Sequence, residues 1–213
     1  MTAAPASDLR IAAVHVARAW ALGRSVHVVS DAPVDVPTIS VVSGEDPCAE
    51  LRSAARTGDA AIVVGAFPDR DRLLARLPAW GVAGIWVGSS QRPPEGVATV
   101  CVEGGPEIVS RILVLAEDLR HDAAALEPAV VECTDEVCVT CSDEGRLGEV
   151  VAAPPVLFAP ARVRTADGVE QIDVTIVGRV APGDLVLIHA GMAIATVPLP
   201  DAVVVPTRSA VMS

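Results

Sequence analysis

The sequence contains no run of about 20 uninterrupted apolar residues, the length that a membrane-spanning helix needs. Its first residues, MTAAPASDLR, also lack the basic segment followed by an apolar one that is typical of a secretion signal. We therefore expect a cytoplasmic protein with no membrane partner. The apolar fraction of 51% is enough to bury a real core in a chain of 213 residues.

Lysine is absent, as are asparagine and tyrosine, so arginine supplies every basic side chain. The formal net charge at pH 7 is -11. Nucleic-acid binding relies on clustered Lys and Arg that release counterions from the phosphates, and the sequence has no such cluster. The composition therefore argues against a nucleic-acid partner.

Cysteine occurs five times, an odd number, without a secretion signal. A disulfide framework is therefore not expected, and the thiols should be reduced. Cys48 and Cys101 are isolated, whereas Cys133, Cys138 and Cys141 lie within nine residues. The clustering matters more than the number, because it indicates a site that uses thiols.

Up to about Glu127, short apolar runs alternate with segments of helical spacing. The runs are rich in Val and Ile and fit buried parallel strands. They lie at residues 25–30, 38–43, 60–66, 84–90 and 98–104, and the helical segments lie at residues 9–23, 50–58, 69–81 and 106–126. This order predicts an α/β domain over residues 1–130 with a doubly wound parallel five-stranded sheet.

After Pro128 the pattern becomes that of antiparallel β-structure. Residues 137–197 have no helical period and contain two turn signals, Asp167-Gly168 and Pro182-Gly183-Asp184. We therefore expect a small β-barrel within residues 131–213. The end of the chain, residues 197–213, has three prolines and is expected to follow the surface or to be disordered.

Two motifs in this second part carry a family resemblance. Residues 182–184 read PGD and residues 188–194 read IHAGMAI, and upstream residues 138–145 read CVTCSDEG. The PGD turn followed by a V-H-A-G-x-A-I strand closely resembles the HypC/HupF family of hydrogenase accessory proteins. The upstream segment looks like the C-x-T-C-S-D opening of the longer HupF-like variants. The resemblance covers roughly the last 75 residues.

The resemblance implies an OB-like β-barrel that carries an iron unit, Fe(CN)2CO, in metallocentre assembly. Its implied partners are a HypD-like maturation protein and the precursor of the hydrogenase large subunit, so the chain would be a chaperone and not an enzyme. In short family members the essential Cys follows the initiator Met, whereas the candidate thiols of this chain are internal.

The residues that we expect to bind the iron are Cys141, Cys138 and His189. A soft thiolate suits low-valent iron, and a neutral imidazole nearby can ligate it or relay a proton. Cys141 is favoured over Cys138 as the essential thiol because it adjoins the polar turn at residues 142–144. The pairing with His189 requires that the strand opening the barrel and the strand ending at His189 are neighbours.

The α/β part resembles, more weakly, the SIS fold of phosphosugar isomerases, which is also doubly wound. SIS domains hold a sugar phosphate through Ser- and Gly-rich loops that follow the first and later strands. The matching loops here are residues 30–33, SDAP, and residues 65–69, GAFPD. Proline has no amide donor and aspartate repels phosphate, so we expect a scaffold that has lost this ligand.

Two other functions remain open. A phosphosugar isomerase would need a carboxylate base in a cleft lined by hydroxyl groups. A zinc or redox sensor could use Cys133, Cys138 and Cys141. Zinc would require a distant His as a fourth ligand, and a redox pair normally precedes a helix, which is not predicted after Cys141.

Three further expectations concern the α/β part. The apolar face of residues 9–20 would permit a homodimer. Trp80 and Trp86 should fill the core beside the sheet. The Arg and Asp residues of 68–76 should form an exposed helix start, with carboxylates near its N-terminus.

Overall fold

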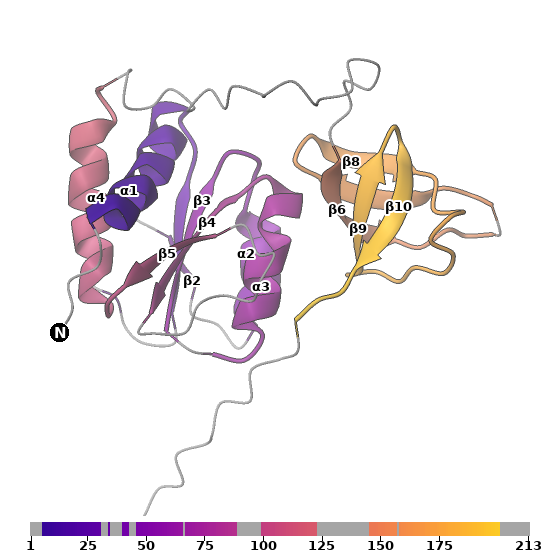
Figure 1. The fold of residues 1–213 in the computed structure, drawn as a ribbon, viewed down its shortest axis with the longest axis horizontal. Coiled ribbons are helices and arrows are strands. Elements are labelled where there is room, and N and C mark those ends of the chain that lie inside the picture. Colours follow the sequence, from indigo (N-terminus) through magenta and orange to yellow (C-terminus); the bar gives the residue numbers. More distant parts are fainter. Residues whose placement is uncertain are drawn as a thin grey trace, which may run out of the picture.

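The structure, a computed structural model, describes residues 6–30, 34, 40–42, 46–65, 67–88, 99–122, 145–156 and 158–200. It has one parallel and one antiparallel β-sheet, and the helices belong to the parallel one (Figure 1). The chain is therefore a mixed α/β protein, as the sequence predicted. None of the helices in these ranges is long and apolar enough to cross a membrane.

The parallel sheet is built from the predicted apolar runs. Its strands are β1 (Val26–Ser30), β2 (Ser40–Val42), β3 (Ala60–Val64), β4 (Ala83–Gly88) and β5 (Val100–Glu103). They are ordered β2-β1-β3-β4-β5, and every neighbouring pair is parallel. β1 and β3 are buried along their whole length, which explains why these runs are almost continuously apolar. The short β2 lies at one edge.

Helices cover both faces of this sheet, so it is doubly wound. They are α1 (Ala6–Ala21), α2 (Pro47–Ala54), α3 (Arg70–Arg76), the 3-10 helix η1 (Pro78–Trp80) and α4 (Glu107–Leu119). α1 and α4 pack on one face, and α2, α3 and η1 pack on the other (Figure 1). The Asp46 side chain caps α2 by accepting the Ala49 amide at 2.9 Å.

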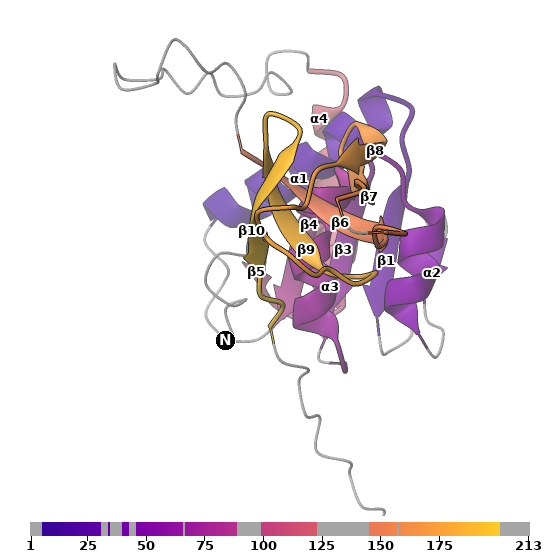
Figure 2. The same cartoon turned by 90° about the vertical axis from the view of Figure 1, so that its right-hand side faces the viewer.

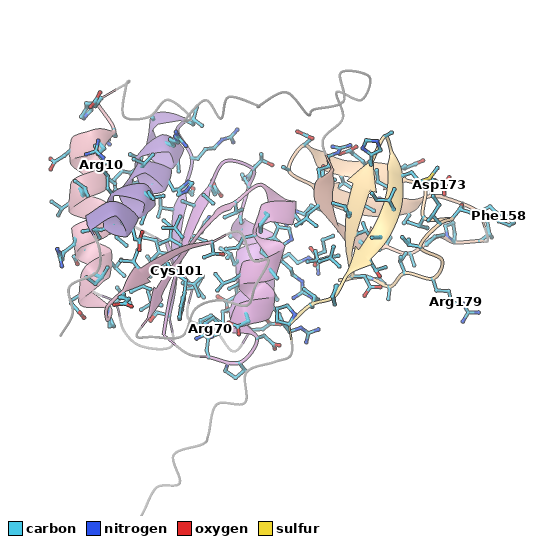
Figure 3. The ribbon with its side chains drawn as sticks, viewed as in Figure 1. Arg10, Arg70, Cys101, Phe158, Asp173 and Arg179 are labelled. Carbon is cyan, nitrogen blue, oxygen red and sulfur yellow. The ribbon has the colours of Figure 1, made fainter. Side chains whose placement is uncertain are left out.

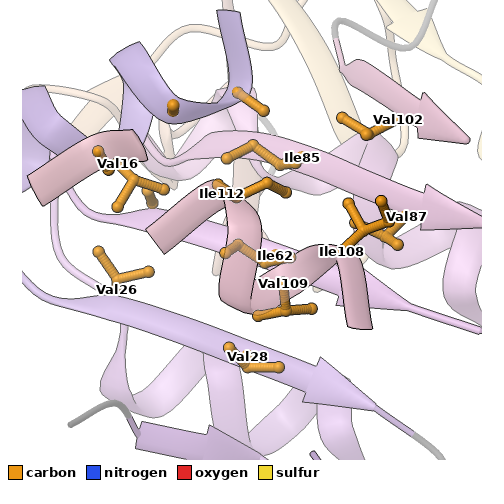
Figure 4. Packing of buried hydrophobic residues seen from close by; sticks show 14 of the residues in the cluster. Val16, Val26, Val28, Ile62, Ile85, Val87, Val102, Ile108, Val109 and Ile112 are labelled. Carbon is orange, nitrogen blue, oxygen red and sulfur yellow. The ribbon is translucent and has the colours of Figure 1, made fainter. Parts of the chain in front are cut away.

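The alternation of side chains along the strands divides the core into two layers. Ile62 of β3 packs with Val16 of α1 and Ile112 of α4 (Figure 4). Its neighbour Val63 points the other way, into the layer that contains Trp80. Both layers consist mainly of buried apolar side chains, many of them fully buried Val, Ile and Leu.

The antiparallel sheet comes from the region with hairpin signals. Its strands are β6 (Arg146–Ala152), β7 (Ala161–Thr165), β8 (Gly168–Ile172), β9 (Leu185–His189) and β10 (Met192–Val197). They are ordered β10-β9-β6-β7-β8. The β7–β8 hairpin forms at the predicted turn, where Thr165 pairs with Gly168. An isolated bridge joins Asp173, directly after β8, to Met192 of β10.

The two sheets are joined by a shared core. Leu185 of β9 is buried in the layer that contains Trp80, and Leu147, Val197 and Leu199 pack against that layer. Viewed from its own side in Figure 2, the antiparallel sheet lies in front of the parallel sheet, with α2 visible beside it. The predicted boundary between residues 130 and 131 lies outside the described residues.

One expectation about an exposed face needs correction. Arg70 was expected at an exposed helix start, but it is 3% exposed; its guanidinium lies 5.0 Å over the Trp86 ring and 2.7 Å from Asp71. Burial is tolerated because the charge is paired and the group stacks on an indole. Most apolar residues of α1 pack against the sheet and α4 of the same chain, whereas Ile11 is 47% exposed, and the homodimer stays a prediction.

Candidate functional site

His189 is the one predicted iron ligand that the structure describes. It is the last residue of β9, is half-buried and pairs with Met192 across the hairpin. Its side chain has no hydrogen bond to another described residue. The imidazole is therefore not committed to a described structural partner, which distinguishes it from the buried His27.

The strand that opens the antiparallel sheet lies directly beside β9, as the predicted pairing required. β6 and β9 are antiparallel, and Arg146 of β6 is opposite Ile188. Gly145, just before β6, also lies close to β9, because a Cβ built there would be 3.4 Å from Leu187 Cδ1. The chain therefore enters the sheet next to His189, four residues after Cys141 in the sequence.

A tight turn fixes the position of His189. Ala190 and Gly191, the two residues between β9 and β10, both have positive φ, 50° and 76°. Two-residue hairpins favour this conformation because its twist matches that of the flanking strands. Glycine adopts it at little cost, whereas Ala190 is held there by the hairpin. The turn thus keeps His189 at the same end of the sheet as the start of β6.

A polar network occupies that end of the sheet. Arg146 donates two hydrogen bonds of 2.8 Å to Glu170 of β8 and a third of 2.8 Å to Asp167 in the β7–β8 turn. Thr165 donates to Glu170 at 2.6 Å. The bonds from Arg146 and Thr165 lower the pKa of Glu170, so it remains ionised. The network ties the first residue of β6 to the β7–β8 hairpin.

The predicted thiol ligands Cys138 and Cys141, like Cys133, lie outside the described residues. Within the described ranges there is no group of three His, Cys, Asp or Glu side chains that could hold a metal ion. The structure therefore places His189 and the entry of β6 together and leaves the thiol part of the site a prediction.

The loops that match the phosphate loops of SIS domains are described in part. Of residues 30–33, only Ser30 is described, and it is buried at the end of β1. After β3, the Phe67 side chain is buried in the core and Pro68 has no amide hydrogen. The described residues of this loop thus present no side-chain hydroxyl group.

A buried charge cluster at the junction of the two sheets was not predicted. Glu149 of β6 is 1% exposed, and it accepts a hydrogen bond of 2.7 Å from Trp80 Nε1. Arg52 Nε and Arg76 Nε each lie 3.3 Å from one of its carboxylate oxygens. A buried carboxylate needs such partners, because an isolated one would be strongly disfavoured.

Arg164 of β7 completes the junction. It donates hydrogen bonds of 2.8 Å to the carbonyls of Arg52 and Ala55, at the C-terminal end of α2. Its guanidinium lies 5.2 Å over the Trp80 ring. A cation at the last carbonyls of a helix is favourable. In the sequence, the only sign of this junction was Glu149, a single acidic residue in an apolar strand. Such a residue does not reveal which distant side chains pair with it.

Apolar side chains are exposed at the end of the antiparallel sheet farthest from the α/β unit. Val156, Phe158 and Ile176 are 68%, 77% and 64% exposed. Beside them is a cavity of about 480 Å³, lined by residues 153–156, 158–159, 174–175 and 178–180. Figure 3 shows Phe158 and Arg179 projecting at this end, which we call the apolar tip. Clustered exposed apolar side chains are typical of protein-binding surfaces.

Comparison of the chain with models of known protein families, and with curated proteins, found no match.

Proposed function

We propose that the chain is an accessory chaperone of [NiFe]-hydrogenase maturation, which holds the Fe(CN)2CO unit together with a HypD-like partner and passes it to the large-subunit precursor. The observation that carries this proposal is the adjacency of β6 and β9. It brings the chain that follows Cys141 to the strand ending at His189, in a sequence that has the IHAGMAI and CVTCSDEG motifs.

In this proposal the iron unit is cargo, and the protein supplies donors to it. The Cys141 thiolate is the principal ligand and Cys138 is the second thiol. His189 either ligates the iron or relays a proton, since its imidazole has no described hydrogen-bond partner. The network of Arg146 with Glu170 and Asp167 keeps the entry to β6 fixed beside the hairpin.

The proposal includes an OB-like barrel for the antiparallel sheet. The bridge between Asp173 and Met192 supports it, because β8 and β10 are the two edge strands of the sheet. Two backbone hydrogen bonds, Asp173 N to Gly191 O at 3.1 Å and Ala193 N to Asp173 O at 2.8 Å, connect these edges. The α/β part would be a SIS-like scaffold without a sugar-phosphate ligand.

The apolar tip is the surface that we assign to the protein partner. A chaperone of this kind binds other proteins. The apolar surface of Val156, Phe158 and Ile176 is in contact with water, and a partner that covers these side chains would remove it from water at a gain in free energy. Phe158 has a φ of 66°, which is unfavourable for a bulky residue. A strained backbone that presents a large apolar side chain to solvent is common at binding sites.

The test is an anaerobic affinity capture of the full-length chain from hydrogenase-expressing cells, with partners identified by mass spectrometry. Wild type should capture a HypD-like protein, and Cys141→Ala and Phe158→Ser should each reduce the yield at least about tenfold. Cys138→Ala and His189→Ala test whether the second thiol and the imidazole also contribute to the capture of the partner.

Two matched controls separate the site from general effects. Cys101→Ala removes a thiol from β5, and His121→Gln removes an exposed imidazole after α4. Both should capture the partner as wild type does. Wild type without any such partner, or equal capture by every variant, would contradict the proposal. Stoichiometric zinc in the purified protein would favour the sensor instead.

A further inference from the structure

Arginine side chains gather beside the junction of the two sheets, although the chain carries a net charge of -11. Arg52 of α2, with Arg72 and Arg76 of α3, lines a cavity of about 300 Å³. Glu149 of β6 and the turn at Pro182-Gly183 form further parts of its wall. The cavity thus takes its walls from both units of the protein.

The carboxylates around this cavity already have partners. Asp46 caps α2, and Asp69 lies 3.4 Å from Arg72 Nη1. Glu149 is engaged by the junction cluster described above. Cys48, which also lines the cavity, remains a neutral thiol because burial raises its pKa. The acidic groups in the wall are therefore largely used by the protein itself.

The three guanidinium groups pair with Asp69 and Glu149 as well, but each has more N–H donors than these pairs use. Each guanidinium has five N–H donors. The Nε of Arg72 is buried and makes no hydrogen bond to a described group. Arg76 donates from Nη1 to the Arg72 carbonyl at 3.5 Å and from Nη2 to the Gly183 carbonyl at 3.3 Å, while its Nε faces Glu149 without hydrogen-bond alignment. Such a surplus of donors suits a ligand that only accepts, which is an oxyanion.

A second cavity adjoins the first at Arg72. It has a volume of about 560 Å³, and its wall combines Leu185, Val197 and Leu199 with Asp184 and Thr196. Arg72 lines both cavities, so this residue joins a polar wall to one with several aliphatic side chains. A ligand that fills both would have a charged head and a short apolar body.

We propose that this junction binds a small organic anion, with a phosphate or carboxylate head between Arg52, Arg72 and Arg76 and an apolar body along Leu185 and Val197. The site goes beyond the proposed chaperone function and does not depend on it, because the clustered thiols and His189 take no part. Since both units contribute to the wall, the bound anion would link them.

The test is isothermal titration calorimetry of the full chain with sodium n-butyl phosphate, sodium butyrate and inorganic phosphate, at constant ionic strength set by sodium chloride. We expect saturable binding of n-butyl phosphate or butyrate, and the one that binds identifies the head group. The organic anion that binds should do so more tightly than inorganic phosphate, because only the organic anions have an apolar body. Arg72→Gln should weaken binding at least about tenfold, since hydrogen bonds to charged groups carry most of the recognition.

Arg120→Gln is a matched control. Arg72 and Arg120 are both 40% exposed and each pairs with a carboxylate three residues earlier, but Arg120 lies on the far side of the α/β unit, after α4. This variant should bind as wild type does, and melting curves should show that both variants fold. No saturable binding of either organic anion, or equal affinity in wild type and Arg72→Gln, would overturn the proposal.

Discussion

Glu149 is a carboxylate in the middle of a strand with 1% of its surface exposed, so its neighbours determine the cost of removing it. Glu149→Ala would leave the Arg52 and Arg76 charges and the Trp80 N–H without their shared acceptor. Because a buried ion pair with one partner missing is strongly unfavourable, we expect the free energy of unfolding to fall by about 3 kcal/mol.

Urea denaturation measures this loss, and Glu170→Ala is the comparison. Glu170 also pairs with an arginine, but it is 32% exposed, so its removal should cost no more than about 1 kcal/mol. Glu149→Gln should fall between these values because the amide oxygen can still accept from Trp80. Equal losses for Glu149→Ala and Glu170→Ala would show that burial does not govern the effect.

His15 of α1 gives the protein a pH dependence. Burial, with a smaller contribution from Arg18, lowers the pKa of His15 below its ordinary 6.5. As the pH falls below 6.5, the unfolded chain takes up a proton that the folded chain resists, so stability decreases until the lower folded pKa is passed. Above 6.5 the contribution of His15 is fully present.

The measurement is urea denaturation at pH 7.5 and pH 5.5. Wild type should lose more stability between these values than His15→Gln, whereas His121→Gln, which changes an exposed imidazole, should behave as wild type does. An identical pH dependence for wild type and His15→Gln would refute the assignment.

At the scale of elements, β6 connects the candidate site with the junction. It begins at Arg146, beside β9, the strand that ends at His189. Three residues further along, Glu149 lies in the junction. Gly148 lies between them, where a Cβ would come within 2.4 Å of Val163 Cγ1 and 2.6 Å of Ile188 Cδ1. The side chains of the two neighbouring strands therefore leave no room for a Cβ at this position unless they shift.

Gly148→Ala should destabilise the protein by about 1–3 kcal/mol, because the buried Val163 has a stiff side chain and cannot easily move away. Gly145→Ala is the matched control, since its nearest contact would be an ordinary 3.4 Å. Thermal or urea unfolding of both variants measures the difference. If Gly148→Ala left the free energy of unfolding unchanged, the side chains next to Gly148 could move aside at no cost, which would contradict this expectation.

Much of the element pattern could be predicted from the sequence, and the exceptions have a common cause. Runs such as residues 60–64 are buried on both faces, so they are continuously apolar and easily recognised. The neighbouring positions of β6 and β9 were a hypothesis that the pairing of Cys141 with His189 required, and the structure shows these strands side by side. Arg70 and Glu149 were missed because the fold, and not the local sequence, decides whether a charged side chain is buried. Arg70 pairs with the adjacent Asp71, but the Trp86 ring on which it stacks comes from another strand. The partners of Glu149, which are Trp80, Arg52 and Arg76, are all distant in the sequence.

At the scale of the whole molecule, the two sheets share part of one core. Leu185 is buried among side chains of the α/β unit, and Arg164 and Thr57 add hydrogen bonds across the junction. We therefore expect a single calorimetric unfolding transition, with equal calorimetric and van't Hoff enthalpies. Arg164→Ala should lower the melting temperature without dividing the transition. Two separate transitions in wild type would show that the junction is too weak to couple the units.

In the proposed function this coupling gives the α/β part a role, because it holds β6, the strand that begins at the end proposed to bind the iron unit. The anion proposed at the junction would act on the same connection. The apolar tip lies at the other end of the antiparallel sheet and remains accessible to a partner (Figure 3).

The infrared spectrum of the anaerobically purified protein tests the central claim most directly. Wild type from hydrogenase-expressing cells should show the stretching bands of iron-bound CO and CN. These bands should vanish in Cys141→Ala and persist in Cys101→Ala, which keeps the clustered thiols. Their absence from wild type that has been purified with a HypD-like partner, or their persistence when both Cys138 and Cys141 are replaced by Ala, would contradict the claim that these thiols carry the iron unit.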